Sequence, residues 1–72
     1  MEQILDYGYL VMLNEFSDNE GELIFLYNCD TLKQAQTRLY EMGIGTCAYD
    51  FIERMSAEKV EMFGFGKLIK RG

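Results

Sequence analysis

The chain contains no histidine. Histidine is the commonest general base and metal ligand near neutral pH. The chain therefore lacks the side chain that most hydrolytic and metal-dependent mechanisms use. The two serines, Ser17 and Ser56, fall in predicted turns without a neighbour that would activate them. Asp50 and Glu53 can approach each other as a carboxylate pair, but we interpret them as exposed charges on an outer face. We therefore expect no enzyme, no cofactor and no metal.

Cysteine and long apolar runs are also scarce. Cys29 and Cys47 are the only cysteines, and they lack the C-x-x-C spacing of redox and metal motifs. No run of about 18 apolar residues and no secretory signal is present, which predicts no membrane contact and a cytoplasmic location. In that compartment isolated cysteines are typically small buried thiols. We interpret both as structural thiols and leave open whether they ever pair.

Positive charge is missing from residues 1–30, which carry seven acids, whereas residues 54–72 carry five cations and two acids. The net charge of −5 argues against direct nucleic-acid binding, because phosphate-binding proteins gather positive charge. The densest acidic site joins two predicted strands and contains Glu15, Asp18, Glu20 and Glu22. These carboxylates either bind a basic groove on a partner in place of phosphates or form a solvated turn. The ordered donors of an EF-hand calcium loop are absent.

One segment has the marks of a helix at both ends. Thr31 and Gln34 have the spacing of a reciprocal capping box, and Gly43 followed by Ile44 has the pattern of a Schellman ending. Apolar residues recur between them at intervals of three and four, which places them on one face: Leu32, Ala35, Leu39 and Met42. The spacing predicts a helix over about residues 32–42.

The first half otherwise has the character of strands. Residues 3–14 combine β-favouring side chains with a partial alternation of apolar residues, as in a strand with one apolar side. The other side of this strand also becomes apolar at Leu10 and Met12. That pattern predicts a central strand, or one whose second face meets a partner. Residues 16–22 are a predicted turn and residues 23–27 a second strand, so the two strands should form a hairpin.

The second half is more ambiguous, because residues 46–55 fit both helical spacing and strand alternation. We favour a strand over 46–54, a turn over 56–59 and a final strand over 60–69. The resulting order is ββαββ. It predicts one compact domain over residues 1–72, an α+β two-layer sandwich with an antiparallel sheet and a helix on one face.

Ten aromatic residues remain to be placed. Because one helix covers one sheet face, some rings are expected on the open face, where they would favour protein binding or self-association; the alternative is that they enlarge a small core. The segment Phe63-Gly64-Phe65-Gly66-Lys67 resembles part of the RNP1 pattern of RNA-recognition motifs, but it lacks the leading basic residue and the apolar continuation. We interpret it as an edge strand in which Phe63 and Phe65 are candidate partner-binding residues.

These features together indicate a binding protein. In size, acidity and lack of a reaction centre the chain resembles the small proteins that phages make to inhibit host machinery, including anti-CRISPR inhibitors. That resemblance implies a small acidic protein-interaction module that inhibits a nucleic-acid-handling or defence protein in the host-cell cytoplasm through a basic surface of that partner. The alternative is a structural or regulatory homodimer with no inhibitory role.

Overall fold

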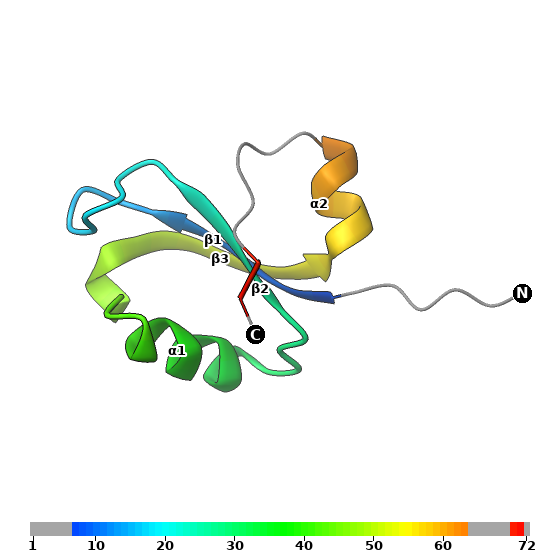
Figure 1. The fold of residues 1–72 in the computed structure, drawn as a ribbon, viewed down its shortest axis with the longest axis horizontal. Helices are drawn as coiled ribbons and strands as arrows, with labels where there is room; N and C mark the ends of the chain where they lie inside the picture. Colours follow the sequence, from blue (N-terminus) through cyan, green and yellow to red (C-terminus); the bar gives the residue numbers. More distant parts are fainter. Residues whose placement is uncertain (1–6, 64–69, 72) are drawn as a thin grey trace, which may run out of the picture.

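The computed structural model describes residues 7–63 and 70–71 of the 72-residue chain (Figure 1). Its elements, in chain order, are β1 (Tyr7–Leu13), β2 (Leu23–Tyr27), α1 (Leu32–Glu41), the short 3-10 helix η1 (Thr46–Ala48), β3 (Tyr49–Ser56), α2 (Ala57–Phe63) and β4 (Lys70–Arg71). The α+β class is as predicted. The ββαββ order with a single helix is wrong, because a second helix follows the third strand.

The strands lie in the order β3-β1-β2-β4. β1 is antiparallel to both of its neighbours, and Val11 pairs with Ile24 on one side and with Ile52 on the other. This confirms that β1 is a central strand and that β1 and β2 form a hairpin. The two-residue β4 pairs with β2 in the parallel sense, so the prediction of a wholly antiparallel sheet is wrong at this edge.

Helix α1 begins where its sequence predicts. The Thr31 hydroxyl accepts from the backbone N–H of Gln34 at 3.2 Å, while the Gln34 side chain accepts from the N–H of Asp30 at 2.7 Å, one residue before the cap. Two otherwise unpaired donors are therefore satisfied. Asp30 also accepts a hydrogen bond of 2.7 Å from the Tyr7 hydroxyl. The start of α1 is thereby joined to the start of β1.

The end of α1 is the predicted Schellman motif. The N–H of Gly43 donates to the carbonyl of Tyr40 at 3.0 Å, and the N–H of Ile44 donates to that of Leu39 at 2.8 Å. Gly43 has φ +83°, a left-handed conformation that a side chain disfavours. Ile44 packs against the core cluster that contains Leu39. The helix ends at Glu41, within one residue of the predicted position.

Apolar residues are buried on both faces of the sheet. The cluster on the α1 face contains Tyr9, Val11, Leu13, Ile24, Leu26, Cys29, Ala35 and Leu39. The cluster on the opposite face, beneath α2, contains Leu10, Phe25, Ala57 and Val60. The prediction of two layers with one open face is therefore wrong, since α2 covers part of the second face.

Helix α2 occupies residues 57–59 of the turn predicted at 56–59 and the beginning of the strand predicted at 60–69. The Ser56 hydroxyl accepts from the N–H of Lys59 at 3.1 Å, and the good helix formers Ala57, Glu58 and Lys59 follow it. Residues 64–69 of that predicted strand lie outside the described residues. Neither of the two α-helices in the described part of the chain has the length and apolar character needed to cross a membrane.

The predicted strand over 46–54 is correct only from Tyr49 onward. Residues 46–48 form a 3-10 turn, and β3 extends to Ser56. Between Met12 and Leu13 the register shifts, so that Met12 faces Phe51 and Leu13 faces Tyr49. One residue of β3, Asp50, is therefore extra to the pairing, as in a β-bulge.

Gly8→Ala is expected to lower the free energy of unfolding by about 3 kcal/mol, because a Cβ at this buried position would overlap the carbonyl oxygen of Leu26. Urea unfolding followed by circular dichroism measures the change. Gly45→Ala is the matched control, since Gly45 has φ −78° and a Cβ there meets nothing within 4 Å. Its stability should be unchanged or slightly higher. Equal losses in the two variants would contradict the close approach of β1 and β2.

Candidate functional site

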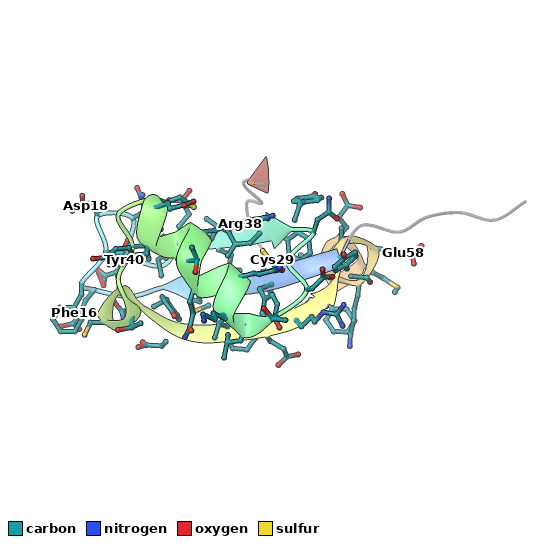
Figure 2. All side chains as sticks on the ribbon, turned by 90° about the horizontal axis from the view of Figure 1, so that it is seen from below. Phe16, Asp18, Cys29, Arg38, Tyr40 and Glu58 are labelled. Atoms are coloured by element: carbon teal, nitrogen blue, oxygen red, sulfur yellow. The ribbon has the colours of Figure 1, made fainter. Side chains whose placement is uncertain are left out.

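The predicted acidic site is an exposed loop of residues 14–22 between β1 and β2, called here the acidic loop. Glu15, Asp18 and Glu20 are exposed, and Glu22 is half-buried where the chain enters β2. Figure 2 shows Phe16 and Asp18 at one end of the molecule and Glu58 of α2 at the other. Three of the four predicted carboxylates are therefore open to solvent at the same end of the sheet.

Backbone hydrogen bonds hold the acidic loop in two successive turns. The N–H of Ser17 donates to the carbonyl of Asn14 at 2.9 Å, and that of Glu22 donates to the carbonyl of Asn19 at 3.0 Å. The Ser17 hydroxyl also accepts from the N–H of Asn19 at 3.2 Å. Gly21 has φ +80°, which suits a residue without a side chain. The carboxylates thus project from a backbone with a defined conformation.

Asn14 connects the acidic loop to the start of β3. Its Oδ1 accepts from the N–H of Phe16 at 2.9 Å. Its Nδ2 donates to the carbonyl of Cys47 and to Oδ1 of Asp50, both at 2.8 Å. Its backbone N–H donates to the carbonyl of Ala48 at 2.9 Å. Sequence reasoning did not identify Asn14, because nothing in the local pattern reveals partners more than 30 positions away.

Phe16 is the second residue that the sequence did not single out as a site residue. Its side chain is 72% exposed although it is aromatic, and it lies beside Glu15 in the acidic loop. A hollow of about 200 Å³ separates this part of the loop from the end of α1, and its lining residues are Phe16, Ser17, Asp18, Asn19, Met42, Gly43, Ile44 and Ala48. The acidic loop therefore presents an apolar ring among carboxylates.

The two predicted aromatic site residues are not part of this surface. Phe63 is the last residue of α2, at the end of the sheet remote from the acidic loop, and its ring lies 5.6 Å from the Lys59 ammonium nitrogen. Its helical position is a correction to the predicted strand. Phe65 lies outside the described residues. The structure therefore does not bring Phe63 together with Glu15, Asp18 or Glu20.

The described residues hold no group of three or more His, Cys, Asp or Glu side chains that could bind a metal ion. Asp50 accepts a hydrogen bond from Asn14, and Glu53 stands opposite Leu10 of β1. Successive residues of a strand alternate between faces, so Glu53 projects from the face opposite to that of Ile52. Asp50 and Glu53, which the sequence suggested as a possible carboxylate pair, therefore have different neighbours in the fold.

The cysteines are both free, but they differ in exposure. Cys29 is fully buried in the core on the α1 face, as predicted, whereas Cys47 is exposed, which corrects the prediction of two buried thiols. Burial raises the pKa of the Cys29 thiol, although the Arg38 guanidinium opposes the shift. Cys29 is therefore both less accessible and less ionised than an ordinary thiol.

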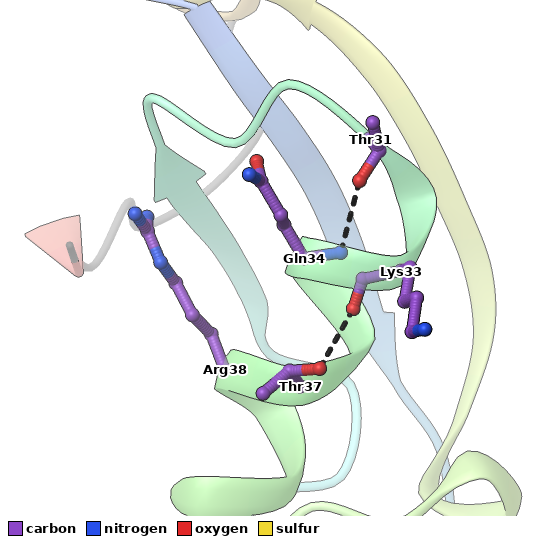
Figure 3. A pocket seen from close by; sticks show the side chains of 5 residues that line it. All are labelled: Thr31, Lys33, Gln34, Thr37 and Arg38. Atoms are coloured by element: carbon purple, nitrogen blue, oxygen red, sulfur yellow. Dashed lines mark hydrogen bonds between the residues drawn. The ribbon is translucent and has the colours of Figure 1, made fainter.

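A further hollow, of about 360 Å³, lies on α1 and is lined by Thr31, Lys33, Gln34, Thr37 and Arg38 (Figure 3). Four of the five lining side chains, those of Thr31, Gln34, Thr37 and Arg38, make hydrogen bonds within the fold. The Thr37 hydroxyl donates to the carbonyl of Lys33 at 2.9 Å, and the Arg38 guanidinium donates to the carbonyl of Tyr27. Because most of the lining polar groups already have partners within the fold, we assign no binding site to this hollow.

Asn14→Asp should lower the free energy of unfolding by about 1–3 kcal/mol, because an oxygen replaces the Nδ2 donor and faces the Cys47 carbonyl and the Asp50 carboxylate. Chemical denaturation at pH 7 measures this loss. Adding Asp50→Asn restores one hydrogen bond in the opposite direction, because the new amide at position 50 can donate to the new carboxylate at position 14. The double variant should therefore recover part of the stability. A single variant as stable as the wild type would show that Asn14 does not anchor the loop.

Alkylation by iodoacetamide at pH 8 should modify Cys47 at least about tenfold faster than Cys29 in the folded protein, because only Cys47 is exposed and burial raises the pKa of Cys29. Peptide mass spectrometry reports the two sites separately. In urea the two rates should converge. Equal rates without denaturant would mean that the core around Cys29 opens readily.

Comparison with protein-family models, curated proteins and solved structures found no match to this chain.

Proposed function

We propose that this chain is a non-enzymatic protein-interaction module whose acidic loop binds a basic surface on a partner protein. The observation that carries the proposal is the ring of Phe16, which is 72% exposed on a loop where Glu15, Asp18 and Glu20 are exposed as well. An aromatic anchor within a polar rim is typical of the residues that dominate binding energy at protein interfaces.

The conformation of the acidic loop supports binding without a large ordering cost. Its two turns and the contacts of Asn14 hold the backbone before any partner arrives. A preordered surface loses less conformational entropy on association than a flexible one. Rigid presentation of Phe16 therefore favours recognition over simple solubility as the purpose of the loop.

The charge distribution supports a basic partner. The first cation in the sequence is Lys33, so the whole β1–β2 hairpin contributes negative charge only. Such a uniform field steers a basic surface toward the loop and disfavours acidic ones. Basic surfaces of proteins commonly bind nucleic-acid phosphates. We accordingly propose inhibition of a nucleic-acid-handling or defence protein, in the manner of phage-type inhibitors, by occupation of its phosphate-binding surface.

A charge-matched pair of variants tests this proposal. The loop variant carries Glu15→Gln, Asp18→Asn and Glu20→Gln; the control carries Glu41→Gln, Glu58→Gln and Glu61→Gln, which removes three exposed acids elsewhere. Tagged proteins are used to capture partners from a lysate of the organism that makes the chain. The wild type and the control should retain the same protein, and the loop variant should lose at least about 90% of it, as expected when desolvated charge pairs are removed.

Two further measurements define the mechanism. Phe16→Ala should weaken binding to the captured protein about tenfold or more, whereas Met62→Ala, at an equally exposed apolar side chain on α2, should not. Added wild-type chain should also displace labelled DNA or RNA from the captured protein, and raised salt should weaken the complex. Equal capture by the loop variant and the control would refute binding through the acidic loop. Capture without displacement would refute the inhibitory mechanism alone.

A further inference from the structure

Strand β3 is the outermost strand at one edge of the sheet. In the order β3-β1-β2-β4 the outer side of β3 has no strand beside it among the described residues. β3 extends from Tyr49 to Ser56, and its sequence has no proline to block pairing. We propose that this edge pairs with the same edge of a second copy of the chain, in an antiparallel arrangement centred on Ile52. The two sheets then continue into each other.

The backbone groups available to a second copy follow from the pairing of β1. The N–H of Leu13 donates to the carbonyl of Glu22, toward β2. Because successive residues of an antiparallel strand alternate their hydrogen bonds between the two sides, Leu10 and Met12 bond toward β3. They face Glu53 and Phe51 there. The intervening residue Ile52, and Arg54 by the same alternation, therefore direct their N–H and C=O groups outward.

The charges of β3 select the register. In a two-fold symmetric antiparallel pair, each residue of one copy faces one residue of the other, and the two residue numbers add up to the same total for every facing pair. Centring on Ile52 places Ile52 opposite Ile52 of the second copy and Asp50 opposite its Arg54, twice by symmetry. Centring on Glu53 or Arg54 would instead place like charges directly opposite each other, which destabilises a pair of strands. Centring on Phe51 shortens the overlap and leaves Arg54 outside it.

The two charged side chains are available for this pairing. Asp50 and Arg54 are both exposed. Asn14 uses only Oδ1 of the Asp50 carboxylate. The Arg54 guanidinium lies over the ring of Tyr7, 5.2 Å from its centroid, a contact that leaves its N–H donors in plane for a carboxylate. Each copy therefore presents one acid, Asp50, and one base, Arg54, at the two positions that face Arg54 and Asp50 of the other copy.

This pairing does not depend on the acidic loop as its binding surface. The outward groups belong to Ile52 and Arg54, whereas the loop comprises residues 14–22. The loop variant with Glu15→Gln, Asp18→Asn and Glu20→Gln should consequently dimerise like the wild type. Loss of partner capture and loss of dimerisation are thus separate results.

Sedimentation equilibrium of the full chain tests the inference. The apparent mass of the wild type should rise from 8.4 kDa toward twice that value between about 10 μM and about 1 mM, the range of a weak dimer. Asp50→Arg opposes Arg54 of one copy with a new cation, and Arg54→Asp opposes Asp50 with a new anion. Each single variant alone should dimerise about tenfold more weakly or worse, because both symmetric pairs become repulsive.

An equimolar mixture of the two single variants is the decisive measurement. In the mixed dimer an acid again faces a base at both positions, so association should return to within about threefold of the wild type. Because Asp50→Arg also removes an acceptor of Asn14, circular dichroism first establishes that each variant is folded, and only folded variants are mixed. A wild type that remains monomeric at 1 mM, or variants that dimerise as well as the wild type, would overturn the proposal. So would a mixture that does not recover.

Discussion

Strand β1 carries apolar side chains on both of its faces, and this requirement for burial organises the rest of the described fold. Val11 points into the cluster beneath α1, and Leu10 points into the cluster beneath α2. Both are fully buried. A strand with two apolar faces is stable only at the centre of a sheet with cover on each side. Gly8 contributes by letting β2 approach where a side chain would collide with it.

The candidate binding surface depends on the same strand. The acidic loop begins where β1 ends, and Asn14 joins the loop to η1 and to the bulge of β3. The position of Phe16 relative to the sheet is therefore set by contacts between three segments rather than by the loop alone. β3, which supplies one of these contacts, also presents the outer edge of the sheet. Partner binding and self-association can thus use different sides of one rigid unit.

Elements with local sequence signals were predicted correctly, and elements that depend on distant contacts were not. The helix over 32–42 and the strand over 23–27 were predicted correctly because their caps, periodicity and bounding turns lie within the segments themselves. Helix α2 was missed because its seven residues are too few for a convincing period. Its stability comes from packing of Val60 with Leu10 and Phe25, residues that are distant in sequence. The strand predicted from residue 60 onward failed over residues 60–63 for the same reason.

The acidic loop shows the same division. Its carboxylates could be located from the sequence, because composition alone shows where charge accumulates. Asn14 and Phe16 could not be distinguished from ordinary loop residues, since the importance of Asn14 lies in partners 33 and 36 positions away. Phe63 lies apart from the acidic loop, because α2 and the loop are at opposite ends of the sheet (Figure 1).

The sequence by itself determined the elements whose signals are local: the two ends of α1, the hairpin of β1 and β2, the central position of β1, and the acidity of the loop. Only the tertiary structure decided which helix covers each face, which edge of the sheet is left without a strand among the described residues, and which loop side chains are anchored or exposed. The physical reason is that caps and turns depend on neighbours within a few residues. Burial, edge exposure and the partners of Asn14 depend on contacts between segments far apart in the chain.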